Sequence, residues 1–133
     1  RATMLKSFNR FLKPEGAVLL DVYSLSAFAK REELSIVEKD LLYGFWSADP
    51  YYGFQQSFKY DDEKVVLDKY TLIEKGRTRT VYNWLQYFSP QSLINEFAAQ
   101  GFTITERYTD VAGAPYESEA GEFAIVARKT ESA

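Results

Sequence analysis

One short apolar run limits what this chain can fold into. Residues 17–22 (AVLLDV) are apolar on both alternating faces apart from Asp21. Such strands are typical of parallel sheets that carry helices above and below. Apolar residues recur every three or four positions between 4 and 12, which predicts an amphipathic helix that the following KPEG turn ends. This order predicts the second half of a βαβ unit, and we expect its first strand to lie upstream of Arg1.

Composition and charge exclude several classes of function. The 133 residues are 46% hydrophobic and 26% charged, which is ordinary for one globular domain. A net charge of −3 gives no electrostatic footprint for nucleic acid, and no apolar stretch reaches the ~20 residues of a membrane span. Without Cys or His there is no thiol nucleophile, thiolate metal site or Ser-His-Asp machinery. We therefore expect a soluble, cytoplasmic protein that binds no metal, nucleic acid or membrane.

The middle and the end of the chain have different patterns. Residues 25–40 are ambiguous, with a short helical stretch that Ser24 could cap. Residues 41–60 are dense in aromatics and predict strand, turn, strand, and two further segments complete an antiparallel meander of about three strands. Ser89 and Pro90 begin a helix. An alternating strand at 102–110 and a strand apolar on both faces at 123–127 then follow.

Three stretches, in this order, resemble the C-terminal half of class I S-adenosylmethionine (SAM)-dependent methyltransferases. FNRFLKPEGAVLLDVYS is similar to the family's helix, Lys-Pro-Gly-Gly-type turn and fifth strand, with Glu15 in place of the first glycine. YFSPQSLINEFAAQGFTITERYTD is similar to the last helix and sixth strand, and GEFAIVARK to the closing strand. The resemblance implies an α/β fold, the C-terminal part of a Rossmann-like sheet built from residues 1–24 and 89–133. Residues 25–88 would be an inserted antiparallel β-meander that caps the substrate side, so that the chain alone looks α+β.

The resemblance also implies methyl transfer from SAM to a small molecule. The family's glycine-rich turn after the first strand has no match here, because the 7 glycines form no G-x-G cluster. We therefore expect a fragment with an incomplete SAM site, inactive alone, whose partner is the missing N-terminal half or a second copy in a homodimer. No catalytic or cofactor-binding residue is assigned. Two alternatives stay open: a non-enzymatic α+β module that binds an apolar small molecule, and a truncated remnant stabilised by oligomerisation through its sheet edge.

Seven residues are candidates for contact with a substrate. Ligands of open α/β sheets bind outside the carboxyl ends of strands, where Asp21 and Tyr23 lie, although Asp21 could instead cap the next turn. Aromatic residues beside turns can line a pocket or pack in a thin β-layer, and we expect them to be partly exposed. A buried amide on a strand needs partners, from the backbone or from a ligand. The candidates are Asp21, Tyr23, Tyr43, Trp46, Tyr51, Tyr82 and Asn83.

Overall fold

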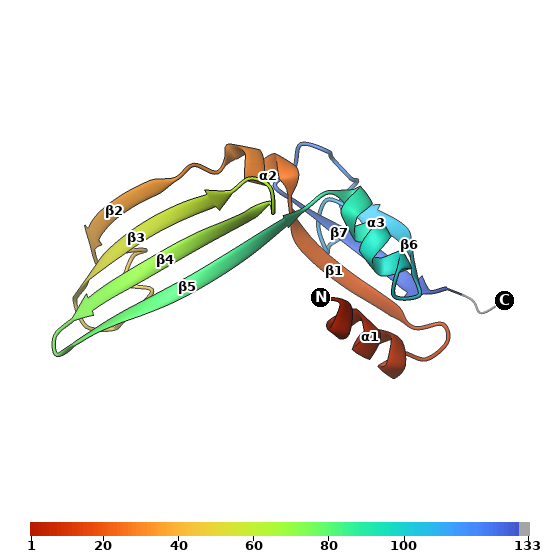
Figure 1. The fold of residues 1–133 in the computed structure, drawn as a ribbon, viewed down its shortest axis with the longest axis horizontal. Coiled ribbons are helices and arrows are strands. Elements are labelled where there is room, and N and C mark those ends of the chain that lie inside the picture. The colour runs from red at the N-terminus through yellow and green to blue at the C-terminus, as the bar shows by residue number, and fades with distance from the viewer. Residues whose placement is uncertain (131–133) are drawn as a thin grey trace. The chain divides into compact units, whose positions relative to one another are not determined.

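The computed structural model describes residues 1–130 and divides the chain into two compact units. Unit 1 combines Arg1–Ala29 with Tyr87–Ala133, and unit 2 is Lys30–Gln86. The elements, labelled in Figure 1, are α1 (Ala2–Phe11), β1 (Ala17–Ser24), α2 (Leu25–Lys30), β2 (Leu34–Lys39), β3 (Tyr51–Tyr60), β4 (Val65–Glu74), β5 (Arg77–Phe88), α3 (Pro90–Ala98), β6 (Phe102–Tyr108) and β7 (Glu122–Lys129). No helix in this described part has the length and apolar character needed to cross a membrane.

Unit 1 is built around β1. β7 pairs with it antiparallel from Ala17 to Tyr23, and β6 pairs antiparallel with β7. On the other side of β1, the last two residues of β5, Tyr87 and Phe88, lie parallel to Tyr23 and Ser24. The unit therefore has the mixed sheet and flanking helices of an α/β fold.

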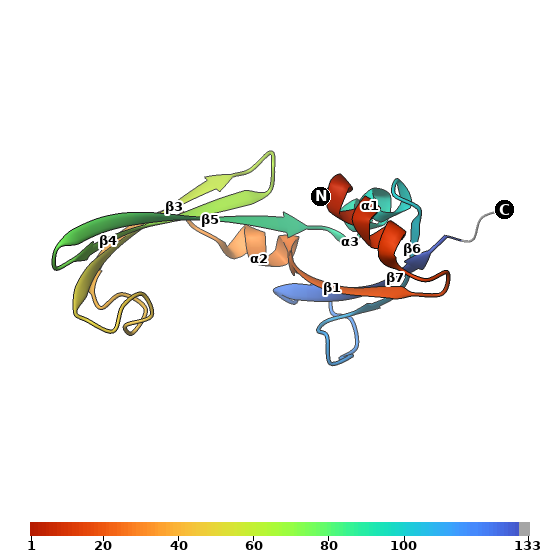
Figure 2. The same ribbon diagram turned by 90° about the horizontal axis from the view of Figure 1, so that it is seen from below.

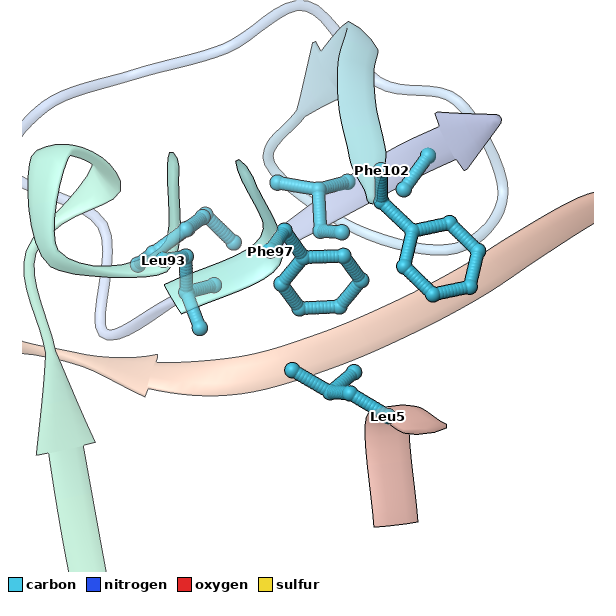
Figure 3. Packing of buried hydrophobic residues seen from close by; sticks show 7 residues of the cluster. Leu5, Leu93, Phe97 and Phe102 are labelled. Atoms are coloured by element: carbon cyan, nitrogen blue, oxygen red, sulfur yellow. The ribbon is translucent and has the colours of Figure 1, made fainter. Parts of the chain in front are cut away.

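The core of unit 1 joins segments that are far apart in the sequence. Leu5 of α1, Leu93 and Phe97 of α3, and Phe102 of β6 are at most 2% exposed and lie in one cluster, which Figure 3 shows from close by. The rings of Phe97 and Phe102 meet edge to face, with centroids 5.8 Å apart. Ser89 begins α3 with a capping box, in which its hydroxyl accepts a hydrogen bond from the Ser92 backbone N–H.

Only one face of β1 is covered in unit 1, so the prediction of a strand buried on both faces is wrong. α1 and α3 both lie over the face that carries Val18, Leu20 and Val22 (Figure 2). On the opposite face, Leu19 and Tyr23 are 54% and 49% exposed. The apolar pattern indicates that both faces of the strand can be buried. The helices of this unit cover only one of them.

A bulge corrects a second prediction, that residues 102–110 alternate regularly. Ile104 pairs with Ala127, but Glu106 pairs with Val126, so one extra residue is inserted between them. Adjacent residues of β7 point to opposite faces, and Glu106 therefore lies on the face opposite Ile104. The bulge thus turns Glu106 away from the core.

Unit 2 is a four-stranded antiparallel sheet in the order β2-β3-β4-β5. The sequence predicted about three strands and took residues 41–60 as strand, turn, strand, but the structure has turns at 41–46. Asp40, Leu42 and Tyr43 have φ between 52° and 60°, and Gly44 has φ 79°, which no strand accommodates. The additional strand is β2, in the segment that was ambiguous.

The loop 40–50 covers part of one face of this sheet, below the strands in Figure 2. Leu41 of the loop packs with the buried strand residues Tyr51, Tyr70 and Leu72. Gly53 makes this approach possible, because a Cβ there would lie 2.4 Å from the Leu41 Cβ. The core of unit 2 is thus thin and depends on a loop rather than on a helix.

Candidate functional site

In unit 1, the carboxyl end of β1 is held by hydrogen bonds of Ser24. Its hydroxyl donates to the Ala120 carbonyl at 2.6 Å and accepts from the Ala27 N–H at 3.1 Å, which caps α2. Asp21 is exposed on the uncovered face of β1 and Ser24, not Asp21, caps the next helix. Tyr23, also on that face, stacks at 5.5 Å on the ring of Tyr87.

A small hollow of about 80 Å³ opens where β1 and β5 end and α3 begins. Its polar lining includes four serines and two glutamates: Ser24, Ser26, Ser89, Ser118, Glu117 and Glu122. Neither Asp21 nor Tyr23 lines it, although ligands of open sheets bind at this end of the strands. Sites for drug-sized ligands measure ~300 to 1,000 Å³, so the hollow on its own holds no more than a small group.

In unit 2, the three aromatic residues predicted to lie beside turns, Tyr43, Trp46 and Tyr51, differ in burial. Tyr43 is fully exposed at the loop tip, as expected for a residue beside a turn. Tyr51 is only 2% exposed, so its predicted partial exposure is wrong. Its hydroxyl donates to the Leu41 carbonyl and accepts from the Trp46 N–H, which fixes the loop on the sheet. Tyr51 is thus part of the packing.

Trp46 is the loop residue with an unmatched polar group. Its ring lies 4.9 Å from that of Tyr70 and 5.0 Å from that of Phe45, and it is half-buried. The Arg79 guanidinium donates to its carbonyl at 2.7 Å. The indole Nε1 is buried and finds no acceptor within residues 1–130. A donor in this state favours an acceptor atom from a ligand or from water.

Tyr82 and Asn83 lie on opposite faces of the unit 2 sheet, so the structure does not bring them together. Tyr82 points away from the loop 40–50 and is 57% exposed. Asn83 stands opposite Asp68 in the register, on the loop side, yet it is exposed. The prediction that Asn83 is a buried amide in need of partners is therefore wrong, because the loop covers only part of this face.

A buried polar cluster on β3 and β4 was missed by the sequence analysis. Asp68 is 4% exposed, and one of its oxygens accepts hydrogen bonds from Ser57 Oγ and Arg31 Nη2, both at 2.5 Å. Gln55 Nε2 donates to Ser57 Oγ at 3.3 Å. The signal was present, since Asp68 alternates with Val66 and Tyr70 on an otherwise apolar strand face.

The charges around this cluster affect Tyr70. Burial raises the pKa of its phenol above the usual 10.0, and the nearby Asp68 carboxylate raises it further. Tyr70 is therefore protonated at neutral pH and can donate a hydrogen bond, but is not suited to act as a base.

The two arginines at the β4–β5 turn form a separate ion-pair group. Glu74 accepts hydrogen bonds from Arg77 Nε at 2.7 Å and Arg79 Nε at 3.1 Å. These bonds, with that from Arg77 the largest cause, lower the pKa of the Glu74 carboxyl. Both guanidiniums are thus engaged with a carboxylate, which argues against a bound anion.

Two observations on this chain bear on the SAM site that the resemblance implies. The chain has no glycine-rich turn, and the hollow at the strand ends is far smaller than an adenosine-containing ligand. Within residues 1–130 there is also no group of three acidic, His or Cys side chains that could hold a metal ion.

Comparison with known proteins shows which fold this is. No family model matches the sequence, and no curated protein does. Solved structures match over 98% of the chain: the methyltransferase CcbJ from Streptomyces caelestis (TM-score 0.72, 14% identity), a SAM-dependent methyltransferase from Clostridium acetobutylicum (0.71, 9%) and the sugar N-methyltransferase KedS8 from Streptoalloteichus (0.60, 19%). The chain spans 50%, 51% and 49% of their lengths, respectively. It therefore has the fold of the C-terminal half of a SAM-dependent methyltransferase.

Proposed function

We propose that this chain forms the substrate-side part of a SAM-dependent methyltransferase that acts on a small molecule. The observation that carries the proposal is the match of 98% of the chain to half of a methyltransferase, at a TM-score of 0.72. In this proposal the donor-binding residues come from polypeptide outside residues 1–133. The chain itself is inactive.

Methyl transfer requires few catalytic groups from this part of the protein. SAM, when bound, supplies an activated methyl group, and the protein has to align the acceptor and exclude water. Hydroxyl, carboxylate and aromatic side chains are sufficient for that, so the absence of His and Cys is no obstacle. We propose that Tyr43 and Trp46 of unit 2 contribute acceptor contacts, because Tyr43 is exposed and the buried Trp46 Nε1 has no acceptor among the described residues.

The names of two similar structures suggest which acceptors to test first. KedS8 is described as a sugar N-methyltransferase, and CalS10 from Micromonospora echinaspora, with a TM-score of 0.51, as an amino pentose methyltransferase. Amino sugars are therefore the first acceptor class to assay.

The test is calorimetric titration of SAM into two proteins at the same concentration and salt. One is the 133-residue chain and the other is extended upstream to the natural start. We expect binding by the extended protein only, and then methyl transfer from labelled SAM to an amino sugar. The matched variants are Tyr43→Ala, at the exposed loop tip, and Phe11→Ala, which is 73% exposed on α1. Tyr43→Ala should raise KM for the acceptor, whereas Phe11→Ala should leave it unchanged.

Two results would overturn the proposal. Clear SAM binding by the 133-residue chain would show that its own residues form a donor site. If neither protein binds SAM, the result would instead favour the non-enzymatic α+β module, whose exposed aromatics would bind an apolar dye in the absence of SAM.

A further inference from the structure

The loop side of unit 2, which is the face of the sheet on which the loop of Trp46 packs, is only partly covered. The ring of Trp46 lies over that of Tyr70, with the centroids 4.9 Å apart. Two positions before Tyr70 on β4, Asp68 is covered by the Arg31 guanidinium, which contacts its carboxylate at 2.5 Å. Asn83 stands beside Asp68 in the register and is exposed. The loop and Arg31 therefore leave part of this face open to solvent.

Three polar groups on this face have no hydrogen-bond partner within the part of the chain that the structure describes. The Trp46 indole Nε1 is buried and has no acceptor. The Tyr70 hydroxyl makes no hydrogen bond, although the residue is only 8% exposed. Asp68 accepts from both Ser57 and Arg31 through one oxygen, Oδ1, so Oδ2 has no donor. Because buried polar groups are normally paired, three such groups together indicate a missing partner.

The three groups lie near one another and can be reached from solvent. Tyr70 and Asp68 are two residues apart on β4, so their side chains point to the same side of the sheet. The Trp46 ring packs on Tyr70 and brings the indole to the same place. Among residues 1–130, Trp46 Nε1 is the only fully buried side-chain donor or acceptor without a partner. The Tyr70 hydroxyl and Asp68 Oδ2 are therefore not sealed from solvent.

The chemistry of these groups selects the class of ligand. An indole N–H only donates, a carboxylate oxygen only accepts, and a protonated phenol can do both. The hydroxyls of a sugar ring match this mixture, because each hydroxyl also donates and accepts. The apolar C–H faces of a sugar suit the Trp46 ring, which offers a large flat surface with one polar atom. A wholly apolar ligand would leave all three groups unpaired and is therefore disfavoured.

We propose that the loop side of unit 2 binds a sugar ring whose hydroxyls bond to Trp46 Nε1, the Tyr70 hydroxyl and Asp68 Oδ2. In this site the Trp46 ring covers one face of the sugar, and the exposed Asn83 amide is available to a further hydroxyl. The site deepens the proposed function and rests on it in one respect, namely that the sugar is the methyl acceptor. Binding of the ring itself requires neither SAM nor a residue outside unit 2.

The indole N–H signals of the two tryptophans test this proposal in the 133-residue chain. Titration of D-glucosamine into the nitrogen-15-labelled protein, without SAM, should shift the Trp46 Nε1–H signal in the NMR spectrum, which Trp46→Phe assigns. Trp84 lies on the opposite face of the sheet, and its signal is the internal control that should not move. Cyclohexylamine has a six-membered ring and the amino group but no hydroxyl. It should bind at least about 10-fold more weakly, because it leaves the polar groups of the site unpaired.

A matched pair of variants isolates the Tyr70 hydroxyl. Tyr70→Phe keeps the buried ring and should weaken glucosamine binding about fivefold, the loss of one neutral hydrogen bond. Tyr52→Phe removes an exposed hydroxyl from the opposite face and should leave binding unchanged. An unmoved Trp46 signal, equally tight binding of cyclohexylamine, or equal effects of the two variants would overturn the proposal. SAM binding by the extended protein tests the proposed function separately, so either proposal can fail while the other stands.

Discussion

The two units bury apolar surface in opposite ways. Unit 1 packs two helices on one face of its strands and draws its core from α1, α3, β6 and β7. Unit 2 has four sequential strands, and its buried cluster joins Leu41 of the loop 40–50 to the strand residues Tyr51, Tyr70 and Leu72. The first unit depends on long-range packing, whereas the second depends on hairpin register and on a few polar and backbone contacts. Substitutions should therefore act by different mechanisms in the two units.

The largest expected effect is in the helical core of unit 1. Phe97→Ala removes a ring that is 1% exposed and should lower the free energy of unfolding by about 4 kcal/mol, because it leaves a cavity among Leu93, Phe102 and Ile125. Amide hydrogen exchange should show lost protection in unit 1. Equal loss in both units would mean that they unfold as one, and the comparison between them would fail.

The next effect should come from the polar cluster of unit 2. Asp68→Ala removes the carboxylate that Ser57 and Arg31 bind, and should cost about 3 kcal/mol, the lower end for a buried ion pair because the Arg31 side chain is 29% exposed. Loss of exchange protection should be confined to β3 and β4. Asp62→Ala, in an exposed turn, is the control and should change stability little.

A smaller effect is expected where the loop approaches the sheet. Gly53→Ala places a methyl group 2.4 Å from the Leu41 Cβ and should destabilise unit 2 by about 2 kcal/mol through overpacking. Gly121→Ala is the matched control, because its Cβ would be 3.8 Å from Ala27. Urea unfolding measures both. A neutral Gly53→Ala would show that the loop can lift from the sheet at no cost.

The smallest effect is a loss of stability at alkaline pH. Folding raises the pKa of Tyr70 above 10.0, chiefly by burial, so its contribution is fully present below pH 10 and is lost as the pH rises through the folded value. Urea unfolding between pH 8 and 11 should show a shallower fall in Tyr70→Phe than in the wild type. Tyr108→Phe is the comparison variant in unit 1, because a hydrogen bond to Glu106 also raises the pKa of Tyr108. Identical pH profiles for wild type and Tyr70→Phe would contradict this assignment.

Much of the fold was predictable because its signals are local. The spacing of Leu5 and Phe8, the cap at Ser89 and the apolar run of β7 each act within a few residues, and all three form the expected elements. The family resemblance rested on these same segments. It gave the α/β class of fold that the comparison with solved structures confirms.

The sequence predictions failed where burial and backbone conformation depend on tertiary packing. An aromatic-rich segment such as 41–46 has strand propensity, and nothing in the sequence marks Leu42 and Tyr43 as left-handed. Asn83 was predicted to be buried, because alternation shows which residues share a face but not how far a loop extends over it. Asp68 was overlooked although it alternates with buried apolar residues, which is a pattern that a reader of the sequence can use.

The placement of the two tryptophans makes the intrinsic fluorescence of this protein specific to one unit. Both lie in unit 2: Trp46 is half-buried within the loop 40–50, and Trp84 is exposed on the face of the sheet that points away from this loop. Indole fluorescence will therefore follow unit 2 alone, and iodide will quench Trp84 more strongly than Trp46. An emission change during denaturation reports the sheet with the loop, while melting of the helical unit passes without a tryptophan signal.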